Sequence, residues 1–200
     1  MDGDLCPLQE IVALTKKYHA HLIIDEAHAT GIIGEKGEGL VQWLGSEREI
    51  FARIHTFGKA CGCHGAVVLG SQNLCSYLIN FSRSFIYTTA LPPASVHAII
   101  KSYNLFPSMR NERIAVNELA HLFKKKEMKY EKVSSNTPIQ GVIVPGNEEV
   151  KEVANRLQAS GFDVRPILYP TVPKGKERLR IVIHSFNTAE HVEGLVGLLV

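Results

Sequence analysis

His21-Leu22-Ile23-Ile24-Asp25-Glu26-Ala27-His28 is a short apolar run that ends in two carboxylates and an imidazole. A continuous apolar run of this length is typical of a central strand in a parallel sheet covered on both faces. In open α/β sheets, binding sites lie beyond the carboxyl ends of such strands. The stretch therefore predicts a buried parallel strand, and it places Asp25 and His28 at a candidate site.

A lysine follows the next apolar run. Residues 50–56 predict a second strand, and Phe57-Gly58-Lys59-Ala60 continues it into a glycine-rich loop. The small neighbours of Lys59 leave room for a flat ring, and a desolvated lysine amine is a nucleophile that forms a Schiff base with an aldehyde. A lone lysine of this kind is most often a solvated loop residue, so the case for chemistry depends on the motif at Asp25.

The carboxylate of Asp25 suggests what kind of ring could lie against the lysine. A pyridine cofactor is a much better electron sink when its ring nitrogen is protonated, and a carboxylate partner maintains that protonation. Asp25 fits this role. His28, three residues later, could exchange a hydrogen bond with an oxygen on the same ring.

Helices and strands alternate along the chain. In the first half we expect a helix at 5–18, strands at 21–24, 50–56 and 65–70, a helix from Ser71 to Ser82, an extended segment at 83–87, a turn at 88–93 and a helix at 96–103. This alternation predicts an α/β fold with a mainly parallel sheet. Because the helical pattern breaks at Pro107, we expect residues 1–106 to belong to a large domain and residues 107–200 to form a smaller α/β domain.

The second half has its own alternating pattern. We expect strands at 139–144, 162–165 and 179–183, with a helix between the first two that begins at an Asn147 cap and ends at Gly161. Asn187-Thr188-Ala189-Glu190 predicts a capping box at the start of a final helix.

Composition excludes several classes of protein. The net charge is +2, and no basic stripe suggests a nucleic-acid partner. No apolar run reaches the roughly 18 residues of a membrane helix, and Met1-Asp2-Gly3-Asp4 is unlike a signal peptide. The 4 cysteines are too few for a disulfide framework, which fits a reducing compartment. We therefore expect a cytoplasmic protein with no membrane partner.

Two other functions share parts of these motifs. Asp25-Glu26-Ala27-His28 is also the metal-binding motif of nucleic-acid helicases, but the phosphate-binding loop and the other helicase motifs are absent. Cys61-Gly62-Cys63-His64 suggests a metal site, but no second Cys or His cluster stands at zinc spacing. We expect neither a helicase nor a metal protein.

Five motifs together resemble the α-oxoamine synthases, which are pyridoxal-phosphate enzymes of fold type I. They are Asp25-Glu26-Ala27-His28-Ala29-Thr30-Gly31, Gly34-Glu35-Lys36-Gly37-Glu38-Gly39, Thr56-Phe57-Gly58-Lys59, Thr88-Thr89-Ala90-Leu91-Pro92-Pro93 and Glu177-Arg178-Leu179-Arg180. The resemblance covers essentially the whole chain. It implies a three-layer, mainly parallel cofactor domain followed by a smaller α/β domain.

The resemblance also implies a role for each site residue. Lys59 would hold pyridoxal 5'-phosphate (PLP) and move the substrate's α-proton, Asp25 would pair with the ring nitrogen, and His28 with the ring oxygen. The remaining roles are phosphate binding by Thr56, phosphate binding in the partner subunit by Thr88 and Thr89, carboxylate binding by Arg180, and substrate contact by Thr171. Thr56 and Thr171 could instead satisfy backbone groups, and Arg178 or Arg180 could form a surface ion pair.

The implied reaction is a decarboxylative condensation of an amino acid with an acyl thioester in a homodimer with shared sites. The chain is most similar to the members of biotin synthesis, which join L-alanine to a pimeloyl thioester; glycine C-acetyltransferase and serine palmitoyltransferase share most of the motifs. Met1-Asp2-Gly3-Asp4 corresponds to an internal segment of the family, so we expect the 200 residues to be an inactive part of the catalytic chain. A non-catalytic partner subunit is the alternative from another class.

Overall fold

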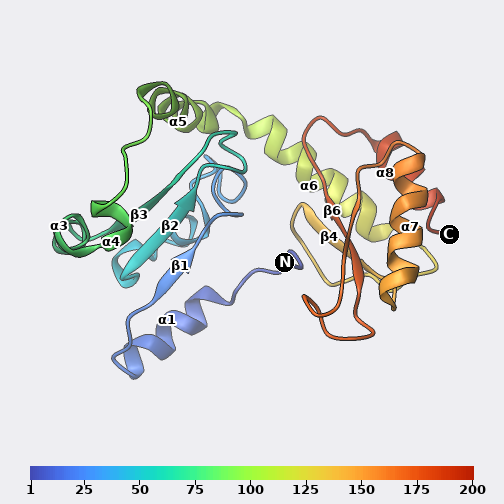
Figure 1. Ribbon diagram of the computed structural model, residues 1–200, viewed down its shortest axis with the longest axis horizontal. Coiled ribbons are helices and arrows are strands. Elements are labelled where there is room, and N and C mark those ends of the chain that lie inside the picture. Colours follow the sequence, from blue (N-terminus) through green and yellow to red (C-terminus); the bar gives the residue numbers. More distant parts are fainter. The chain divides into compact units, whose positions relative to one another are not determined.

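The structure, a computed structural model, describes residues 1–200 as two compact units (Figure 1). Pro7–Arg110 form one unit, and Asn111–Val200 form the other together with Met1–Cys6. The sequence placed the boundary at 106/107 and the first residues in the large domain. They lie with the second unit because the Gly3 carbonyl accepts hydrogen bonds from the hydroxyls of Ser135 (2.9 Å) and Thr137 (2.8 Å). Contacts between residues so distant in sequence leave no local signal.

The sheet of the first unit has the order β1 (Ile23–Asp25), β2 (Ala52–Thr56), β3 (Ala66–Gly70). Strands β1 and β2 are parallel, as predicted, but β3 runs antiparallel to β2. A parallel partner needs a crossover of about a dozen residues or more, and residues 57–65 are too short a link for one. The prediction of a central, doubly covered β1 is wrong within this unit: β1 is an edge strand, and Ile23 is 58% exposed.

The first unit also contains several helices. They are α1 (Leu8–Lys17), α2 (Leu40–Trp43), the 3-10 turn η1 (Glu47–Glu49), α3 (Gln72–Phe81), α4 (Arg83–Ile86), α5 (Pro93–Leu105) and η2 (Phe106–Ser108). The predicted Ser71 cap is confirmed, since its hydroxyl accepts the Leu74 amide at 3.2 Å. The predicted extended segment at 83–87 is wrong, because the carbonyl of Ser82 accepts the amides of Phe85 and Ile86 and so begins the short helix α4.

The second unit contains β4 (Ile139–Ile143), β5 (Arg165–Ile167) and β6 (Arg178–Val182), in the antiparallel order β4-β6-β5. Its helices are α6 (Arg110–Lys125), α7 (Asn147–Ala159) and α8 (Ala189–Gly197). All three contribute to one apolar core with Leu179 and Ile181 of β6 (Figure 1). Arg178 and Arg180 alternate with these residues, so they lie on the opposite face of β6. None of the helices in either unit combines the length and the apolar character that a membrane span requires.

Two predicted caps are displaced by one residue. Helix α7 is capped by Gly146, and the Asn147 side chain instead bonds the backbone of Tyr169 through its oxygen (3.0 Å) and its nitrogen (3.3 Å). Helix α8 begins with a capping box between Thr188 and His191, instead of the box that was predicted to start at Asn187. At α8, Asn187 and Thr188 offer similar side-chain acceptors, so backbone geometry decides which one forms the cap; Gly146 precedes α7 without any side-chain cap hydrogen bond.

Candidate active site

The ends of β1 and β2 form a polar edge in the first unit. Asp25 is the last residue of β1 and Thr56 the last of β2, and the register pairs Asp25 with Ile54. Because the two strands are parallel, their carboxyl ends meet at the same edge of the sheet. Asp25 and Thr56 therefore lie at one edge of the sheet.

Lys59 lies in the loop that leaves this edge. Its Nζ donates a hydrogen bond to Thr56 Oγ1 at 3.4 Å. The loop is closed by backbone bonds from the Gly62 amide to the Lys59 carbonyl (2.9 Å) and from the Cys63 amide to the Phe57 carbonyl (2.7 Å). The Lys59 side chain is exposed. An amine and a hydroxyl therefore stand together in an open position.

Gly65 ends this loop at a place where a side chain would not fit. Its φ is +109°, and a Cβ there would lie 3.0 Å from Leu91 Cδ1. Leu91 belongs to the segment that carries Thr88 and Thr89, both of which are exposed. The structure thus places Leu91 against the lysine loop, while no hydrogen bond joins Thr88 or Thr89 to Lys59.

Asp25 begins a tight turn that also carries His28. The Asp25 Oδ1 atom accepts the Ala27 amide at 2.8 Å. The Glu26 carbonyl accepts the amides of Ala29 and Thr30, each at 2.9 Å, and the Thr30 hydroxyl at 3.0 Å. Both Asp25 and His28 are exposed. The turn therefore presents a carboxylate and an imidazole at the sheet edge.

Beneath this turn lies a buried charge cluster that the sequence analysis did not identify. Glu26 is 1% exposed, and its Oε2 accepts Arg53 Nε at 2.7 Å and contacts Arg53 Nη2 at 2.6 Å. The Oε1 atom accepts the Val41 amide at 2.9 Å. Burial by itself would raise the pKa of Glu26, but hydrogen bonds from His55, the Val41 amide and Arg53 outweigh it and hold the pKa below its usual value. The only signal in the sequence was the alternation of Arg53 and His55 along a strand.

The cluster continues through His55 to Tyr103. His55 Nε2 lies 3.3 Å from Glu26 Oε2, and its Nδ1 lies 2.9 Å from the Tyr103 hydroxyl. Burial, followed by the nearby Cys61, raises the pKa of Tyr103 to about 12. Burial raises the pKa of Cys61 to about 11, with a smaller contribution from Cys63. Tyr103 therefore stays protonated at neutral pH and can donate to His55.

The thiols near Lys59 make internal contacts. Cys63 Sγ donates to the Cys61 carbonyl at 3.1 Å, and the Ser102 hydroxyl donates to the same carbonyl at 2.9 Å. No group of three or more His, Cys, Asp or Glu side chains is placed to hold a metal ion.

Arg180 and Thr171 belong to the second unit. Arg180 is half-buried on β6 and its Nε donates to the Met1 carbonyl at 3.3 Å, while Thr171 is exposed. Arg178 Nη1 forms an ion pair with Asp2 Oδ1 at 2.7 Å, in which the arginine side chain is 10% exposed and the aspartate side chain 34%. The carboxylate of Glu177 accepts the amides of Gly146 (2.9 Å) and Gly175 (2.8 Å).

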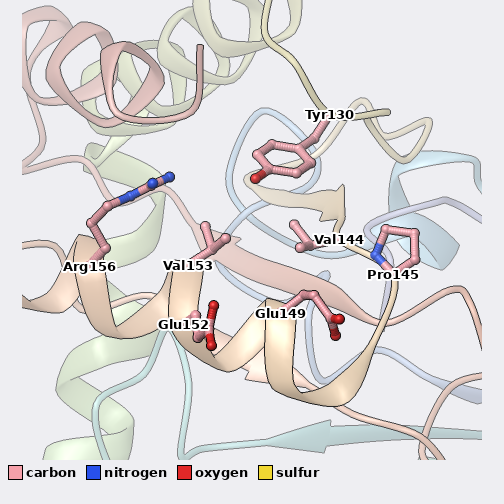
Figure 2. A pocket seen from close by; sticks show the side chains of 7 residues that line it. All are labelled: Tyr130, Val144, Pro145, Glu149, Glu152, Val153 and Arg156. Atoms are coloured by element: carbon pink, nitrogen blue, oxygen red, sulfur yellow. The ribbon is translucent and has the colours of Figure 1, made fainter.

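The second unit also has a pocket of about 480 Å³ that contains none of the predicted site residues. Figure 2 shows Tyr130 across the pocket from the side chains of α7. Its lining residues are Tyr130, Val144, Pro145, Glu149, Glu152, Val153 and Arg156. The charged residues of this lining are exposed, and no buried polar group points to a ligand.

Known proteins share both the sequence and the fold. An 8-amino-7-oxononanoate synthase from Emericella nidulans is 39% identical over 98% of this chain and 50% of its own length. A solved serine palmitoyltransferase from S. paucimobilis with a bound PLP–myriocin aldimine has a TM-score of 0.91 and 26% identity, covering 100% of this chain and 51% of that one. A solved 8-amino-7-oxononanoate synthase from Francisella tularensis has a TM-score of 0.85 and 25% identity, covering 100% of this chain and 58% of that one.

The chain spans about half the length of the curated relatives it matches. The solved relatives confirm the predicted α/β fold, that of fold type I PLP-dependent transferases. The aminotransferase class I and II family matches residues 1–197. With almost the whole chain matched and the polar edge in place, the protein belongs to the aminotransferase class I and II family.

Proposed function

We propose that the polar edge of the first unit is part of a PLP site. The observation that carries this proposal is the Lys59 amine 3.4 Å from the Thr56 hydroxyl, at the sheet edge where Asp25 also ends its strand. An amine, a hydroxyl and a carboxylate are the groups that an aldehyde, a phosphate and a pyridine nitrogen require. When bound, PLP supplies an electron sink for the carbanion formed at an amino acid's α-carbon.

Each residue has a specific task in this proposal. The Lys59 amine holds the cofactor's aldehyde carbon and afterwards moves the α-proton of the substrate. Asp25 keeps the ring nitrogen protonated, His28 bonds the ring oxygen, and Thr56 bonds the phosphate. Arg180 grips the substrate carboxylate through two parallel hydrogen bonds, and the exposed Thr171 contacts the substrate.

Two further threonines are assigned to the partner in a homodimer. Thr88 and Thr89 are exposed and are not bonded to Lys59, which suits a contact with the phosphate of a second subunit.

The reaction we assign is the one that the curated relatives' name indicates. L-Alanine condenses with a pimeloyl thioester, a new carbon–carbon bond forms at the α-carbon, and carbon dioxide and the thiol leave, which gives 8-amino-7-oxononanoate in biotin synthesis. The thiol is that of coenzyme A or of a carrier protein. The 39% identity to the Emericella nidulans enzyme supports this choice.

We also propose that the 200 residues alone bind PLP weakly and sustain no turnover, and that the working enzyme is cytoplasmic. Lys59, Asp25 and His28 are all exposed in the structure, so little here shields a cofactor from water. Steady condensation by the 200-residue chain alone would contradict this part of the proposal.

Borohydride reduction tests the assignment of Lys59. The protein is incubated with saturating PLP, reduced and digested, and the peptides are analysed by mass spectrometry. We expect a pyridoxyl group on the Lys59 peptide and its loss from that peptide in the Lys59→Arg variant. Lys36, an exposed lysine of the same unit, serves as the internal control for random labelling. Equal labelling of Lys36 and Lys59 would refute the assignment.

Two alternatives remain open to experiment. The TM-score of 0.91 to serine palmitoyltransferase favours a related synthase with another acyl donor as the second candidate. Thiol release in the active assembly, measured with acetyl, succinyl, palmitoyl and pimeloyl thioesters, decides between them. A non-catalytic partner subunit would release no thiol from any donor, although it would still associate with an active chain.

A further inference from the structure

We propose that Glu26 is a positioning residue for the PLP site: its buried carboxylate, held by Arg53 and His55, fixes the turn that aims Asp25 at the cofactor's ring nitrogen. This inference rests on the proposed function, because it assigns the cause of the orientation of Asp25.

The carboxylate of Glu26 is held from three directions. Arg53 of β2 reaches Oε2 through Nε at 2.7 Å and Nη2 at 2.6 Å. His55, two residues further along the same strand, lies 3.3 Å from Oε2, and the Val41 amide of α2 donates to Oε1 at 2.9 Å. The side chain therefore ties the turn after β1 to both the neighbouring strand and a helix.

The backbone of Glu26 is equally restrained. Its amide donates to the Ile54 carbonyl at 2.8 Å, and its carbonyl accepts the amides of Ala29 and Thr30. Asp25, by contrast, is exposed, and its Oδ1 is oriented by the Ala27 amide. Because Ala27 directly follows Glu26, a shift of Glu26 moves the hydrogen-bond donor that orients Asp25.

The charges in the cluster explain why a carboxylate is needed at this position. Two nitrogen groups surround Glu26 Oε2: Arg53 Nε donates to it at 2.7 Å, and His55 Nε2 lies 3.3 Å away. Arg53 supplies only donors. A glutamine at this position would keep one acceptor for Val41 but would turn its NH₂ group toward Arg53 and His55. Donors would then face donors, and the turn would move to separate them.

The site leaves no room to absorb that movement on the side of Gly39. A Cβ on Gly39 would lie 2.7 Å from Glu26 Oε1, and the φ of Gly39 is +94°. The carboxylate thus packs directly against the backbone of the segment that begins α2. Displacement of the turn is therefore directed toward the exposed side, where Asp25 lies.

The test compares Glu26→Gln with the wild-type protein by using PLP labelled with ¹⁵N in the ring. We expect the dissociation constant for PLP to rise about tenfold, by analogy with the loss found when a partner that orients a metal ligand is removed. The ¹⁵N resonance of the bound cofactor should move toward that of a neutral pyridine. Labelling of Lys59 at saturating cofactor should persist. Weaker binding with an unshifted ¹⁵N resonance would show a merely structural role and overturn the inference.

A matched control and a milder variant keep the test decisive. Glu177→Gln makes the same change at a buried carboxylate of the second unit and should leave the ¹⁵N resonance unchanged. Tyr103→Phe keeps the Glu26–Arg53 charge pair but removes the hydroxyl that contacts His55. We expect the ¹⁵N resonance of bound PLP to shift in the same direction as in Glu26→Gln, by a smaller amount. If Glu26→Gln does not fold, an unshifted resonance in Tyr103→Phe would overturn the inference.

A measurement without cofactor separates this inference from the proposed function. In the cofactor-free protein, hydrogen exchange of the Ala27 amide should be faster in Glu26→Gln and unchanged in Glu177→Gln. If the wild-type protein shows no pyridoxyl label on Lys59, the proposed function fails. The hydrogen-exchange rate of the Ala27 amide then still decides whether Glu26 fixes the turn that orients Asp25. Unchanged exchange at Ala27 in Glu26→Gln would overturn the role.

Discussion

Replacing Arg53 by methionine removes the charge that balances Glu26 and keeps an unbranched side chain of similar reach. The Glu26 and Arg53 side chains are 1% and 11% exposed. The variant loses the contacts of Nε and Nη2 to Glu26 and the 3.2 Å hydrogen bond from Nη2 to the Glu38 carbonyl. Removing one partner of a buried ion pair destabilises a protein by about 3–5 kcal/mol. We expect a loss in the lower part of this range at pH 7, because His55 and the Val41 amide still bond Glu26.

The sign of the pH dependence follows from the lowered pKa of Glu26. In the wild-type protein the stability due to this carboxylate is present above its unfolded pKa and is lost as the pH falls through its folded pKa. In Arg53→Met the contributions of Arg53 that lower the Glu26 pKa are lost, so this pKa is higher than in the wild-type protein and the ionised carboxylate contributes less stability. The difference in free energy of unfolding between the two proteins should therefore be largest at neutral pH and should shrink on acidification.

Urea unfolding monitored by Trp43 fluorescence measures this difference. Trp43 is the single tryptophan of the chain and lies in the first unit, on the helix whose Val41 amide bonds Glu26. The double variant Glu26→Gln/Arg53→Met is the control, because it leaves no buried charge behind and should recover part of the loss. A loss below about 1 kcal/mol at pH 7, or one that grows on acidification, would refute the reasoning, since a solvated surface pair gives no more than that.

Two further predictions concern the second unit. Leu157→Ala removes a fully buried side chain from the core of α6, α7, α8 and β6, and should lower the free energy of unfolding by about 2–5 kcal/mol, as measured by circular dichroism in urea. Leu157→Met keeps most of the side-chain volume and should cost much less. An equal loss in both variants would contradict the cavity argument. Thr188→Ala removes the hydroxyl that accepts the His191 amide and should cost about 1 kcal/mol in the same assay, with Thr188→Ser retaining most of the stability. A neutral Thr188→Ala would show that the cap contributes nothing.

Local sequence patterns predicted the elements of the fold well where the physics is local. The hydroxyl of Ser71 caps α3 as expected, because the interaction spans only three residues. The apolar runs before Asp25 and Lys59 became the parallel pair β1 and β2, which brings Asp25 and Thr56 to one edge. The antiparallel direction of β3 and the edge position of β1 were not predicted, since an apolar run does not specify which strand will be its neighbour.

The candidate site shows the same division. The types and order of its residues, from Asp25 and His28 to Thr56 and Lys59, could be predicted from the motifs, and the 3.4 Å contact between Lys59 and Thr56 connects two residues that are close in sequence. The sequence also contained Glu26, within the same motif, but gave no reason to separate it from Asp25.

What the sequence determined by itself is therefore the family, the α/β class and the set of polar groups at the ends of two strands, because motif spacing and hydrophobic periodicity are properties of the chain alone. Only the tertiary structure decided that Asp25 is exposed while the adjacent Glu26 is buried against Arg53 and His55. Neighbouring residues at a strand end point to opposite sides, and burial on one side depends on which distant side chains arrive there. Here those side chains come from β2 and from Tyr103 of α5, and no local pattern in residues 25–28 could have revealed them.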